Sequence, residues 1–215
     1  NSFQKKYRKM FKKTVVINSF RKKNSIIKKD QIKFVKNTKN QSNLSSHFLV
    51  GKKLINNVEK GNLISLKNIK QKVGAIIVAR LSSSRLPNKA ILKINDTPSI
   101  CLVIRRLKKI KRLDQIILAT SKEKKDYQLI KIAKKENIQF FRGSLNNVVN
   151  RYYMAAKKFK LDQIVRITGD AILFDDLMMA KAISSQLKKN SDVTFIRNMP
   201  YGTAKEVINY KTIET

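Results

Sequence analysis

Apolar and polar positions follow two different patterns along the chain, and the change comes near residues 70–72. Before that point, short apolar segments are separated by frequent turn residues, and Gly61 follows Lys60 where a tight turn needs a positive φ. After it, continuous apolar segments alternate with segments whose apolar residues recur at helical spacing. The pattern therefore predicts a small β-rich part at residues 12–70 and a larger α/β part at residues 71–215.

The larger part alternates predicted strands with predicted helices. The apolar pattern predicts these elements in chain order: strand 74–79, helix 100–110, strand 115–120, helix 127–135, strand 138–141, helix 149–159, strand 163–168, helix 175–188 and strand 192–196. We expect Ser144 to cap the third helix and Val149 and Tyr152 to share its buried face. Continuous apolar strands between amphipathic helices are typical of an α/β fold, a mostly parallel sheet with helices on both faces.

Polar residues follow four of these strands, each at the point where the strand ends. They are Arg80, Thr120, Arg142 and Asp170. The carboxyl ends of parallel strands lie at one edge of a sheet, and ligands of open α/β sheets bind at that edge. We therefore expect the four side chains to converge on one binding site.

The loop after the first strand, residues 80–89, contains three cations and three serines. Arg80 and Arg85 can bind phosphate oxygens through paired hydrogen bonds, Lys89 supplies a point charge, and serine hydroxyls such as that of Ser83 donate further bonds. This combination predicts polyphosphate binding, and a solvated basic loop is the alternative. The loop lacks the glycine spacing of the Walker A motif and of the dinucleotide fingerprint, which excludes both motifs.

The sequence RITGD at residues 166–170 places Asp170 just past a buried strand, where Gly169 frees the backbone. A lone carboxylate there suits Mg²⁺, which keeps several waters and bridges to substrate phosphates. A turn aspartate without a ligand role is the alternative. Both interpretations stay open on the residues alone.

Charge and composition narrow the functional classes. The chain has 48 Lys and Arg against 14 Asp and Glu, a net charge of +34. Such a charge fits a protein that binds nucleic acid or an anionic surface. Lys, Asn and Ile are all abundant, however, which indicates the codon bias of an AT-rich genome, and no zinc, RNA-binding or helix-turn-helix motif is recognisable. We therefore expect no nucleic-acid partner.

Single residues and the absence of long apolar stretches set further limits. One histidine excludes a histidine-rich metal site, and one cysteine, Cys101, excludes an internal disulfide and fits a reducing compartment. No apolar stretch approaches the roughly 18 residues that a membrane-spanning helix needs. We expect a cytoplasmic protein without membrane insertion.

Three segments together resemble the nonulosonate cytidylyltransferases: IIVARLSSSRLPNK at 76–89, FRGSLNNVVNRYYMAA at 141–156 and RITGD at 166–170. The resemblance covers residues 73–215 and is nearest to the spore-coat-polysaccharide branch, beside the acylneuraminate and KDO enzymes. It implies a Rossmann-like sheet of the nucleotide-sugar transferase type. It also implies an enzyme that transfers CMP from CTP to an acidic nonulosonic sugar, of the sialic or legionaminic type, and releases pyrophosphate with Mg²⁺ as cofactor.

The same resemblance assigns roles to residues at matching positions. For CTP binding it implies Arg80, Ser83, Arg85, Lys89, Thr120, Ser121 and Arg142. For catalysis it implies Arg80, Lys89 and Asp170, and for the metal Asp170 and Glu206. Ala204 stands where the family carries a second metal-side aspartate, and Lys205 follows it. We expect CTP and an acidic sugar as partners, and a homo-oligomer.

The first part resembles the SAF, or antifreeze-like, domain that ends sialic acid synthases, mainly through VEKGNLISLKNI at 58–69. The match covers residues 12–70, and residues 1–11 resemble the last helix of the synthase barrel. This implies a β-clip module. It also implies a chain that joins the end of a synthase to a cytidylyltransferase domain, residues 71–215, whose C-terminal parts are missing.

Two further hypotheses stay open. Ala204, the amides of Asn146, Asn147 and Asn150 where acids are common, and the short C-terminus favour a non-catalytic nucleotide-binding or assembly module of a bifunctional synthase. The net charge favours a basic nucleic-acid-binding protein, which is the weaker of the two. Nucleotide binding without pyrophosphate release distinguishes the first of these from an enzyme.

Overall fold

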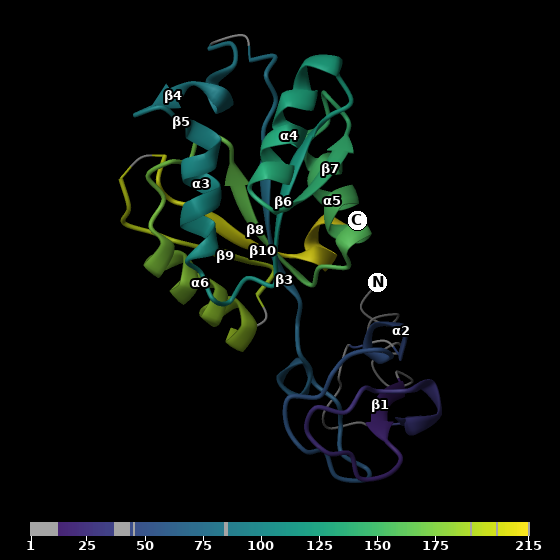
Figure 1. The fold of residues 1–215 in the computed structure, drawn as a ribbon. Coiled ribbons are helices and arrows are strands. Elements are labelled where there is room, and N and C mark those ends of the chain that lie inside the picture. Colours follow the sequence, from purple (N-terminus) through teal and green to yellow (C-terminus); the bar gives the residue numbers. More distant parts are fainter. Residues whose placement is uncertain are drawn as a thin grey trace, which may run out of the picture. The chain divides into compact units, whose positions relative to one another are not determined.

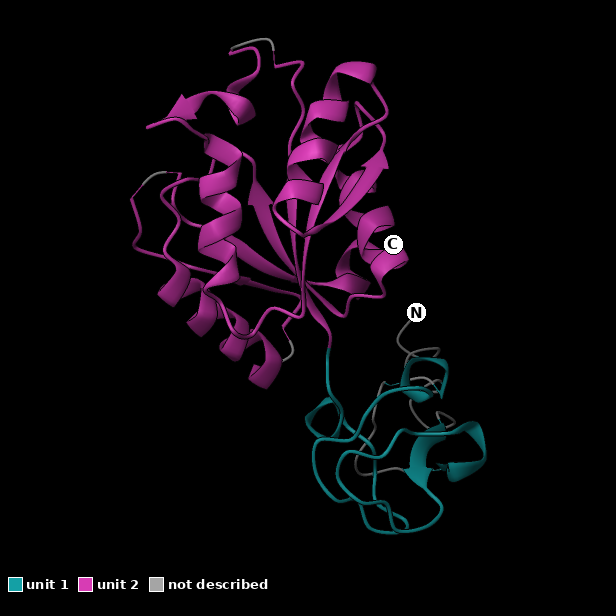
Figure 2. Ribbon diagram, in the orientation of Figure 1, with its two compact units in different colours: residues 1–71 teal, residues 72–215 magenta. Residues whose placement is uncertain are grey.

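The computed structural model of the protein describes residues 13–36, 44, 46–83, 86–189, 191–200 and 202–214. The chain divides into two compact units, residues 1–71 and 72–215, which Figure 2 shows in different colours. Each unit has its own buried apolar residues. Within the described ranges, no helix combines the length and the apolar character needed to cross a bilayer.

The second unit is built on a six-stranded sheet in the order β7-β6-β3-β8-β10-β9 (Figure 1). Its strands are β3 (Val73–Val78), β6 (Gln115–Ser121), β7 (Gln139–Gly143), β8 (Gln163–Thr168), β9 (Val193–Phe195) and β10 (Glu206–Asn209). The pairs among β7, β6, β3 and β8 are parallel, whereas β10 pairs antiparallel with both of its neighbours. The predicted α/β fold with a mostly parallel sheet is therefore confirmed.

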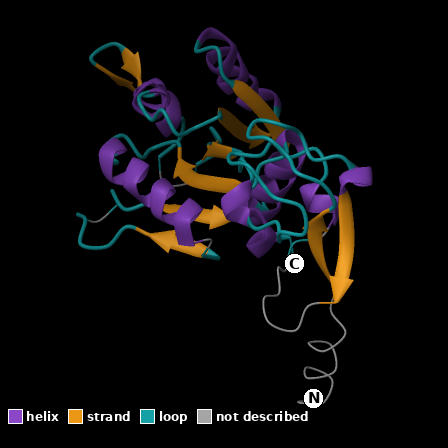
Figure 3. Cartoon of the chain, turned by 90° about the horizontal axis from the view of Figure 1, so that it is seen from below, coloured by secondary structure: helices purple, strands orange, loops and turns teal. Residues whose placement is uncertain are grey.

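The helices of this unit lie on both faces of the sheet, and Figure 3 marks them in purple against the orange strands. They are α3 (Ser99–Lys108), α4 (Tyr127–Lys135), α5 (Val148–Phe159) and α6 (Asp176–Lys189). Successive side chains of a strand point to opposite faces. Accordingly, Ala75 and Ile77 of β3 pack with α3, α4 and α6, and Ile76 packs with α5. This double burial explains the unbroken apolar sequence of β3.

Short elements complete the unit. A two-stranded hairpin, β4 (Lys93–Ile94) with β5 (Thr97–Pro98), precedes α3. The 3-10 helices are η3 (Lys89–Ile91), η4 (Lys124–Asp126) and η5 (Tyr210–Ile213). η3 and η4 follow the loops that leave β3 and β6, so they position residues at the carboxyl edge of the sheet.

The start of α5 differs from the prediction. Asn147, not Ser144, is its N-cap, because the Asn147 side chain accepts from the Asn150 N–H at 2.8 Å. The Ser144 hydroxyl instead accepts from the Asn147 N–H at 3.1 Å, inside the turn that precedes the helix. The predicted buried face is also only partly right: Tyr152 is buried, but Val149 is 64% exposed.

The strand β10 was not predicted from the sequence. Its four residues contain one buried side chain, Val207, so the segment lacks the apolar run that marks the other strands. It inserts between β8 and β9, with Glu206 opposite Arg166. The insertion brings the segment after residue 200 to the edge of the sheet where β8 ends.

Among its described residues, the first unit has one two-stranded sheet and a small apolar core. Its elements are β1 (Lys13–Ile17), β2 (Ile32–Lys36), α2 (Ser46–Leu49), η1 (Lys29–Gln31) and η2 (Leu66–Asn68). β1 and β2 pair antiparallel. Gly61 has φ +83°, as its place in a tight turn predicts. The predicted helical segment at residues 1–11 lies outside the described residues.

The first unit contains an approximate two-fold repeat, 37 positions apart. Arg21 and Val58 exchange two backbone hydrogen bonds, both 2.9 Å, across its centre. Around this pair, the Ile17 N–H donates to Asn62 and the Leu54 N–H donates to Ser25. The 3-10 helices η1 and η2 are equivalent too: the N–H that precedes each one is bound by the Gln31 or the Asn68 side chain. Two copies of one local structure therefore build this unit.

Candidate functional site

A cleft of about 410 Å³ lies where β3 and β8 end. The loop after β3, the η3 turn, the residues around the start of α5, and the end of β8 line it. Its polar lining residues are Arg80, Ser83, Lys89, Asn146, Arg151, Tyr152, Arg166, Thr168 and Asp170. The structure therefore brings four of the predicted site residues together: Arg80, Ser83, Lys89 and Asp170.

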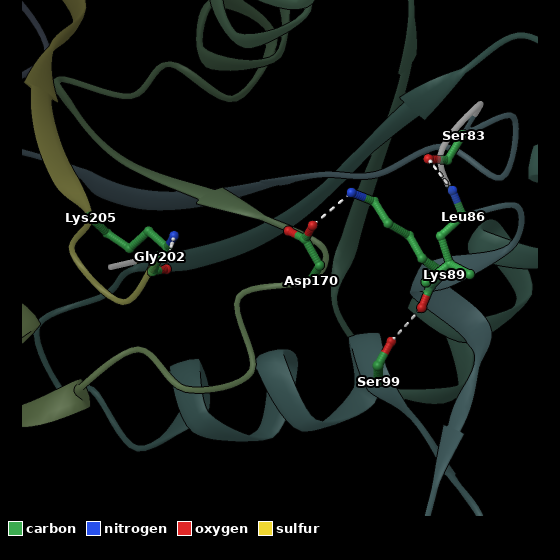
Figure 4. Close-up of polar contacts among 7 residues, drawn as sticks. All are labelled: Ser83, Leu86, Lys89, Ser99, Asp170, Gly202 and Lys205. Carbon is green, nitrogen blue, oxygen red and sulfur yellow. Dashed lines mark hydrogen bonds and ion pairs between the residues drawn. The ribbon is translucent and has the colours of Figure 1, made fainter. Parts of the chain in front are cut away.

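Lys89 and Asp170 form an ion pair in this cleft (Figure 4). Their Nζ and Oδ2 atoms lie 2.6 Å apart, although 81 positions separate the residues in the chain. Burial favours a higher pKa for Asp170, but hydrogen bonds from Lys89 and Thr168 outweigh it and hold the pKa below its usual value. Asp170 is therefore ionised at neutral pH. Both side chains are substantially exposed, so the pair is weak and Lys89 can exchange its partner for a phosphate.

Two arginines of the cleft donate to one backbone carbonyl. The guanidiniums of Arg80 and Arg151 donate to the Leu145 oxygen, at 3.5 Å and 2.8 Å. Arg151 also donates to the Ser144 oxygen at 2.8 Å and is only 1% exposed. Burial, and then the charge of Arg80, lower the pKa of Arg151. Both guanidiniums bind carbonyls here, so their positive charge is available to an anion in the cleft.

Asp126 holds the base of the first loop in place. This fully buried carboxylate accepts from the Leu81 N–H at 2.8 Å and from both the hydroxyl and the N–H of Ser121. Burial favours a higher pKa for Asp126, but these bonds outweigh it and the pKa is lowered. Asp126 therefore ties the loop that carries Arg80 to the end of β6.

The remaining residues predicted to bind CTP lie elsewhere. Thr120 and Ser121 are fully buried at the end of β6, and neither lines the cleft. Arg142 is exposed, and its guanidinium donates to the carbonyls of Ser121, at 3.4 Å, and Lys122. Arg85 lies outside the described residues. Thr120, Ser121 and Arg142 thus do not line this cleft, and CTP binding by all four residues stays a prediction.

Glu206, the second predicted metal ligand, forms an ion pair with Arg166. Arg166 lines the cleft, and its hydrogen bond to Glu206 raises its pKa in spite of burial. Among the described residues, no group of three His, Cys, Asp or Glu side chains could hold a metal. Asp170 offers one carboxylate, which fits a hydrated divalent ion that takes its other ligands from water and phosphate. Glu206 fits such an ion only if Arg166 releases it.

Two cleft residues were missed because they lie inside regular elements. Arg151 belongs to α5 and Arg166 to β8. A signal was present for both in the sequence: Arg166 stands between the apolar residues Val165 and Ile167, and Arg151 precedes the buried Tyr152. A cation among buried neighbours needs a polar partner or a ligand.

Gly169 lets the chain approach closely at the floor of the cleft. A Cβ atom on this residue would lie 2.8 Å from the Cβ of Ala79, at the end of β3. The Gly169 N–H also donates to the Val78 oxygen at 3.0 Å. Gly169 therefore lets Asp170, the next residue, lie close to the loop that carries Arg80.

Comparisons with known proteins concern the second unit. The family model described as Cytidylyltransferase matches residues 74–215. The MJ1063 protein of Methanocaldococcus jannaschii, which is named as uncharacterized, is 38% identical over 143 residues, 66% of this chain and 59% of its own length. The spore coat polysaccharide biosynthesis protein SpsF of Bacillus subtilis is 30% identical over 138 residues, 62% of this chain and 58% of its own length.

A solved structure gives the same relationship. The structure of a cytidylyltransferase from Leptospira borgpetersenii matches with a TM-score of 0.63 at 33% identity, and covers 67% of this chain and 63% of that chain. The matched parts thus make up 58% to 63% of the length of these three proteins. The family match begins after the first unit.

Proposed function

Because this chain belongs to the cytidylyltransferase family, we propose that it transfers CMP from CTP to a hydroxyl of an acidic sugar and releases pyrophosphate. The observation that carries this proposal is the convergence of Arg80, Lys89, Arg151 and Asp170 on one cleft. Cations and one carboxylate, placed where parallel strands end, suit a nucleoside triphosphate and its divalent ion.

The loop after β3 binds the leaving pyrophosphate in this proposal. Arg80 and Ser83 line the cleft from that loop, and Lys89 follows at η3. Attack on the α-phosphorus moves negative charge onto the leaving group, and positive side chains fixed in advance stabilise that charge. Arg151 holds the facing turn through the Ser144 and Leu145 carbonyls. Arg85 of the same loop is proposed to contribute as well.

Asp170 is the residue proposed to hold Mg²⁺. It is ionised, because its pKa is lowered, and its pairing with Lys89 is exchangeable. The ion supplies a Lewis acid that neutralises phosphate charge. Lys89 then has two roles at this position: it keeps Asp170 charged before substrate binds, and it donates to a phosphate oxygen afterwards.

The proposed class of acceptor sugar is based on the excess of positive side chains in the cleft and on the family resemblance. We propose a nonulosonic acid of the sialic or legionaminic type, because an acidic acceptor complements a cationic cleft. SpsF, one of the relatives, is named for polysaccharide biosynthesis. We further propose that the first unit is an SAF-type module of a synthase, that the protein acts as a homo-oligomer, and that it works in the cytoplasm.

Nucleotide binding tests the proposal first. We expect CTP with Mg²⁺ to raise the melting temperature, and Arg80→Ala to remove most of that rise while the exposed Arg112→Ala leaves it intact. Pyrophosphate release from CTP is then measured with a panel of nonulosonic acids. Loss of one preorganised contact to the transition state lowers the rate about 10²–10³-fold, so we expect a reduction of that size for Arg80→Ala. If CTP with Mg²⁺ leaves the melting temperature of the unaltered protein unchanged, the proposal is wrong.

A non-catalytic nucleotide-binding module is the second candidate. The ion pair between Arg166 and Glu206 favours it, because a paired Glu206 does not offer a free carboxylate to a metal. This candidate predicts the same CTP-dependent rise in melting temperature, but no pyrophosphate release with any acid. The two measurements together therefore distinguish the candidates.

A further inference from the structure

Lys205 is not one of the residues that line the cleft, but Figure 4 shows its amine directed toward Asp170, which does line it. Lys205 lies just before Glu206, the first residue of β10. Its Nζ donates to the Gly202 oxygen at 2.7 Å, within a turn in which Gly202 has φ +81° (Figure 4). The turn brings the amine of Lys205 back over its own loop, toward the end of β8.

The charges around Lys205 are those of the cleft. Asp170, toward which the amine is directed (Figure 4), lines the cleft, and Glu206, the next residue in the chain, forms an ion pair with Arg166 of the cleft. The hydrogen bond of Lys205 in the structure goes to a carbonyl, so the amine keeps donors for a ligand.

Lys205 and the phosphate-binding loop lie on different sides of Asp170. Figure 4 shows Asp170 between the amines of Lys89 and Lys205, with Ser83 beyond Lys89. In phosphoryl transfer the attacking and the leaving oxygens lie roughly in line, on opposite sides of the phosphorus. If the pyrophosphate leaves on the side of Ser83 and Lys89, the acceptor sugar approaches from the side of Lys205.

The charge around the cleft favours an acceptor that is itself an anion. The described lining of the cleft has four cations and one carboxylate, which are Arg80, Lys89, Arg151 and Arg166 against Asp170. Glu206, paired with Arg166, and Lys205 lie beside that lining. Lys89 is paired with Asp170. The hydrogen bond of Lys205 goes to a backbone carbonyl instead, so no carboxylate in that bond neutralises its charge. Lys205 is therefore the cation on this side of Asp170 that we consider for an anionic acceptor.

We propose that Lys205 binds the carboxylate of the acceptor sugar and so selects acidic sugars over neutral ones. This inference rests on the proposed function, because it assigns one substrate group to a side chain of the same site. A charge-assisted hydrogen bond to a carboxylate is stronger than a neutral one, so its loss weakens binding markedly.

A pair of substrates and three variants test the inference in the full chain. The substrates are N-acetylneuraminate and 3-deoxy-manno-octulosonate, each as the free acid and as its methyl ester. The variants are Lys205→Ala, Lys205→Arg and, as a control that removes one exposed lysine, Lys181→Ala of α6. We expect Lys205→Ala to raise the KM of the acid about tenfold to a hundredfold. The KM of the ester and the affinity for CTP should stay within about twofold, and Lys205→Arg should recover part of the loss.

The outcomes separate this inference from the proposed function. If Lys205→Ala raises the KM of acid and ester equally, or leaves both unchanged, Lys205 does not recognise the carboxylate and the inference is overturned. If it weakens CTP binding as strongly as Arg80→Ala, Lys205 belongs to the nucleotide site, and the inference is again wrong. If the unaltered protein releases pyrophosphate with none of the acids, the proposed function fails, and the inference with it.

Discussion

At the residue scale, Asp126 organises the cleft from beneath its surface. The carboxylate is fully buried, and its hydrogen bonds come from Leu81, next to Arg80, and from Ser121, at the end of β6. A buried carboxylate without such donors carries a large free-energy cost. The two segments therefore hold Asp126 in its charged form, and Asp126 in turn fixes the path of the loop.

Asp126→Asn is expected to make stability less dependent on pH. The folded pKa of Asp126 is lowered, so its contribution is present above the unfolded pKa of about 3.9 and is lost as the pH falls through the folded value. At neutral pH the amide cannot accept from both segments as the carboxylate does, and we expect a loss of about 1–3 kcal/mol in the free energy of unfolding. Urea unfolding at a series of pH values measures this loss.

The loss should begin to shrink below about pH 4, where Asp126 takes up a proton in the unfolded chain, and should disappear as the pH falls through the lowered folded pKa. Asp96→Asn is the matched control, because the side chain of Asp96 is almost fully exposed. A variant at Asp126 whose destabilisation is the same at pH 3 and pH 7 would refute the assignment of this pH dependence to Asp126.

The same scale shows what the sequence can and cannot predict about the cleft. The sequence predicts that Arg80 and Asp170 lie together, because both follow apolar strands and parallel strands end at one edge of the sheet. Ser121 follows a strand as well, but its hydroxyl is used by Asp126. Position along a strand cannot separate these cases, because both are polar residues at a strand end. The difference lies in the buried acid five residues later, which needs donors of its own.

At the element scale, the beginning of α5 forms part of the lining of the cleft. The turn before this helix supplies the Ser144 and Leu145 carbonyls that bind Arg151, and Leu145 also receives Arg80. The cap that starts the helix, Asn147, is therefore part of the support of the site. The turn and the helix start should loosen together.

We expect Asn147→Ala to destabilise the second unit by about 0.5–2 kcal/mol, because the Asn150 N–H loses its capping acceptor. Ser144→Ala should cost less, because Ser144 accepts from a residue of the turn and is not the cap. The midpoint of urea unfolding compares the two variants. A larger loss for Ser144→Ala would restore Ser144 as the cap and overturn the structural assignment.

The elements themselves were largely predictable, for a physical reason. β8 has the predicted bounds, 163–168, and α4 the predicted 127–135, because both sides of the sheet are covered and apolar residues therefore cluster in these segments. β10 escaped prediction, because an antiparallel strand held by backbone pairing needs few apolar side chains. Arg166 and Glu206 meet only because of that strand, so the composition of the cleft on that side could not be foreseen.

At the scale of the whole molecule, two features matter: the net charge of +34 and the division of the chain into two units. The charge produces a positive field that attracts anions from a distance and weakens with salt. The repeat in the first unit was not predicted from the sequence. Lys23, Ile27 and Ile32 recur 37 positions later as Lys60, Ile64 and Ile69, but most equivalent positions hold different residues. Gln31 and Asn68, for example, make the same bond with different side chains. None of the described residues that line the cleft belongs to that unit.

The last prediction follows from this division of the chain. Every described residue that lines the cleft belongs to the second unit, and so do the buried apolar residues that pack around β3. We therefore expect a protein of residues 72–215 to fold and to show the same rise in melting temperature with CTP and Mg²⁺ as the full chain, to within about a twofold change in affinity. Residues 1–71 alone are the control and should show no rise, because they carry none of the lining side chains. If residues 72–215 fold, as judged by circular dichroism, but ignore CTP, the cleft needs the first unit, and its assignment to the second unit alone is wrong.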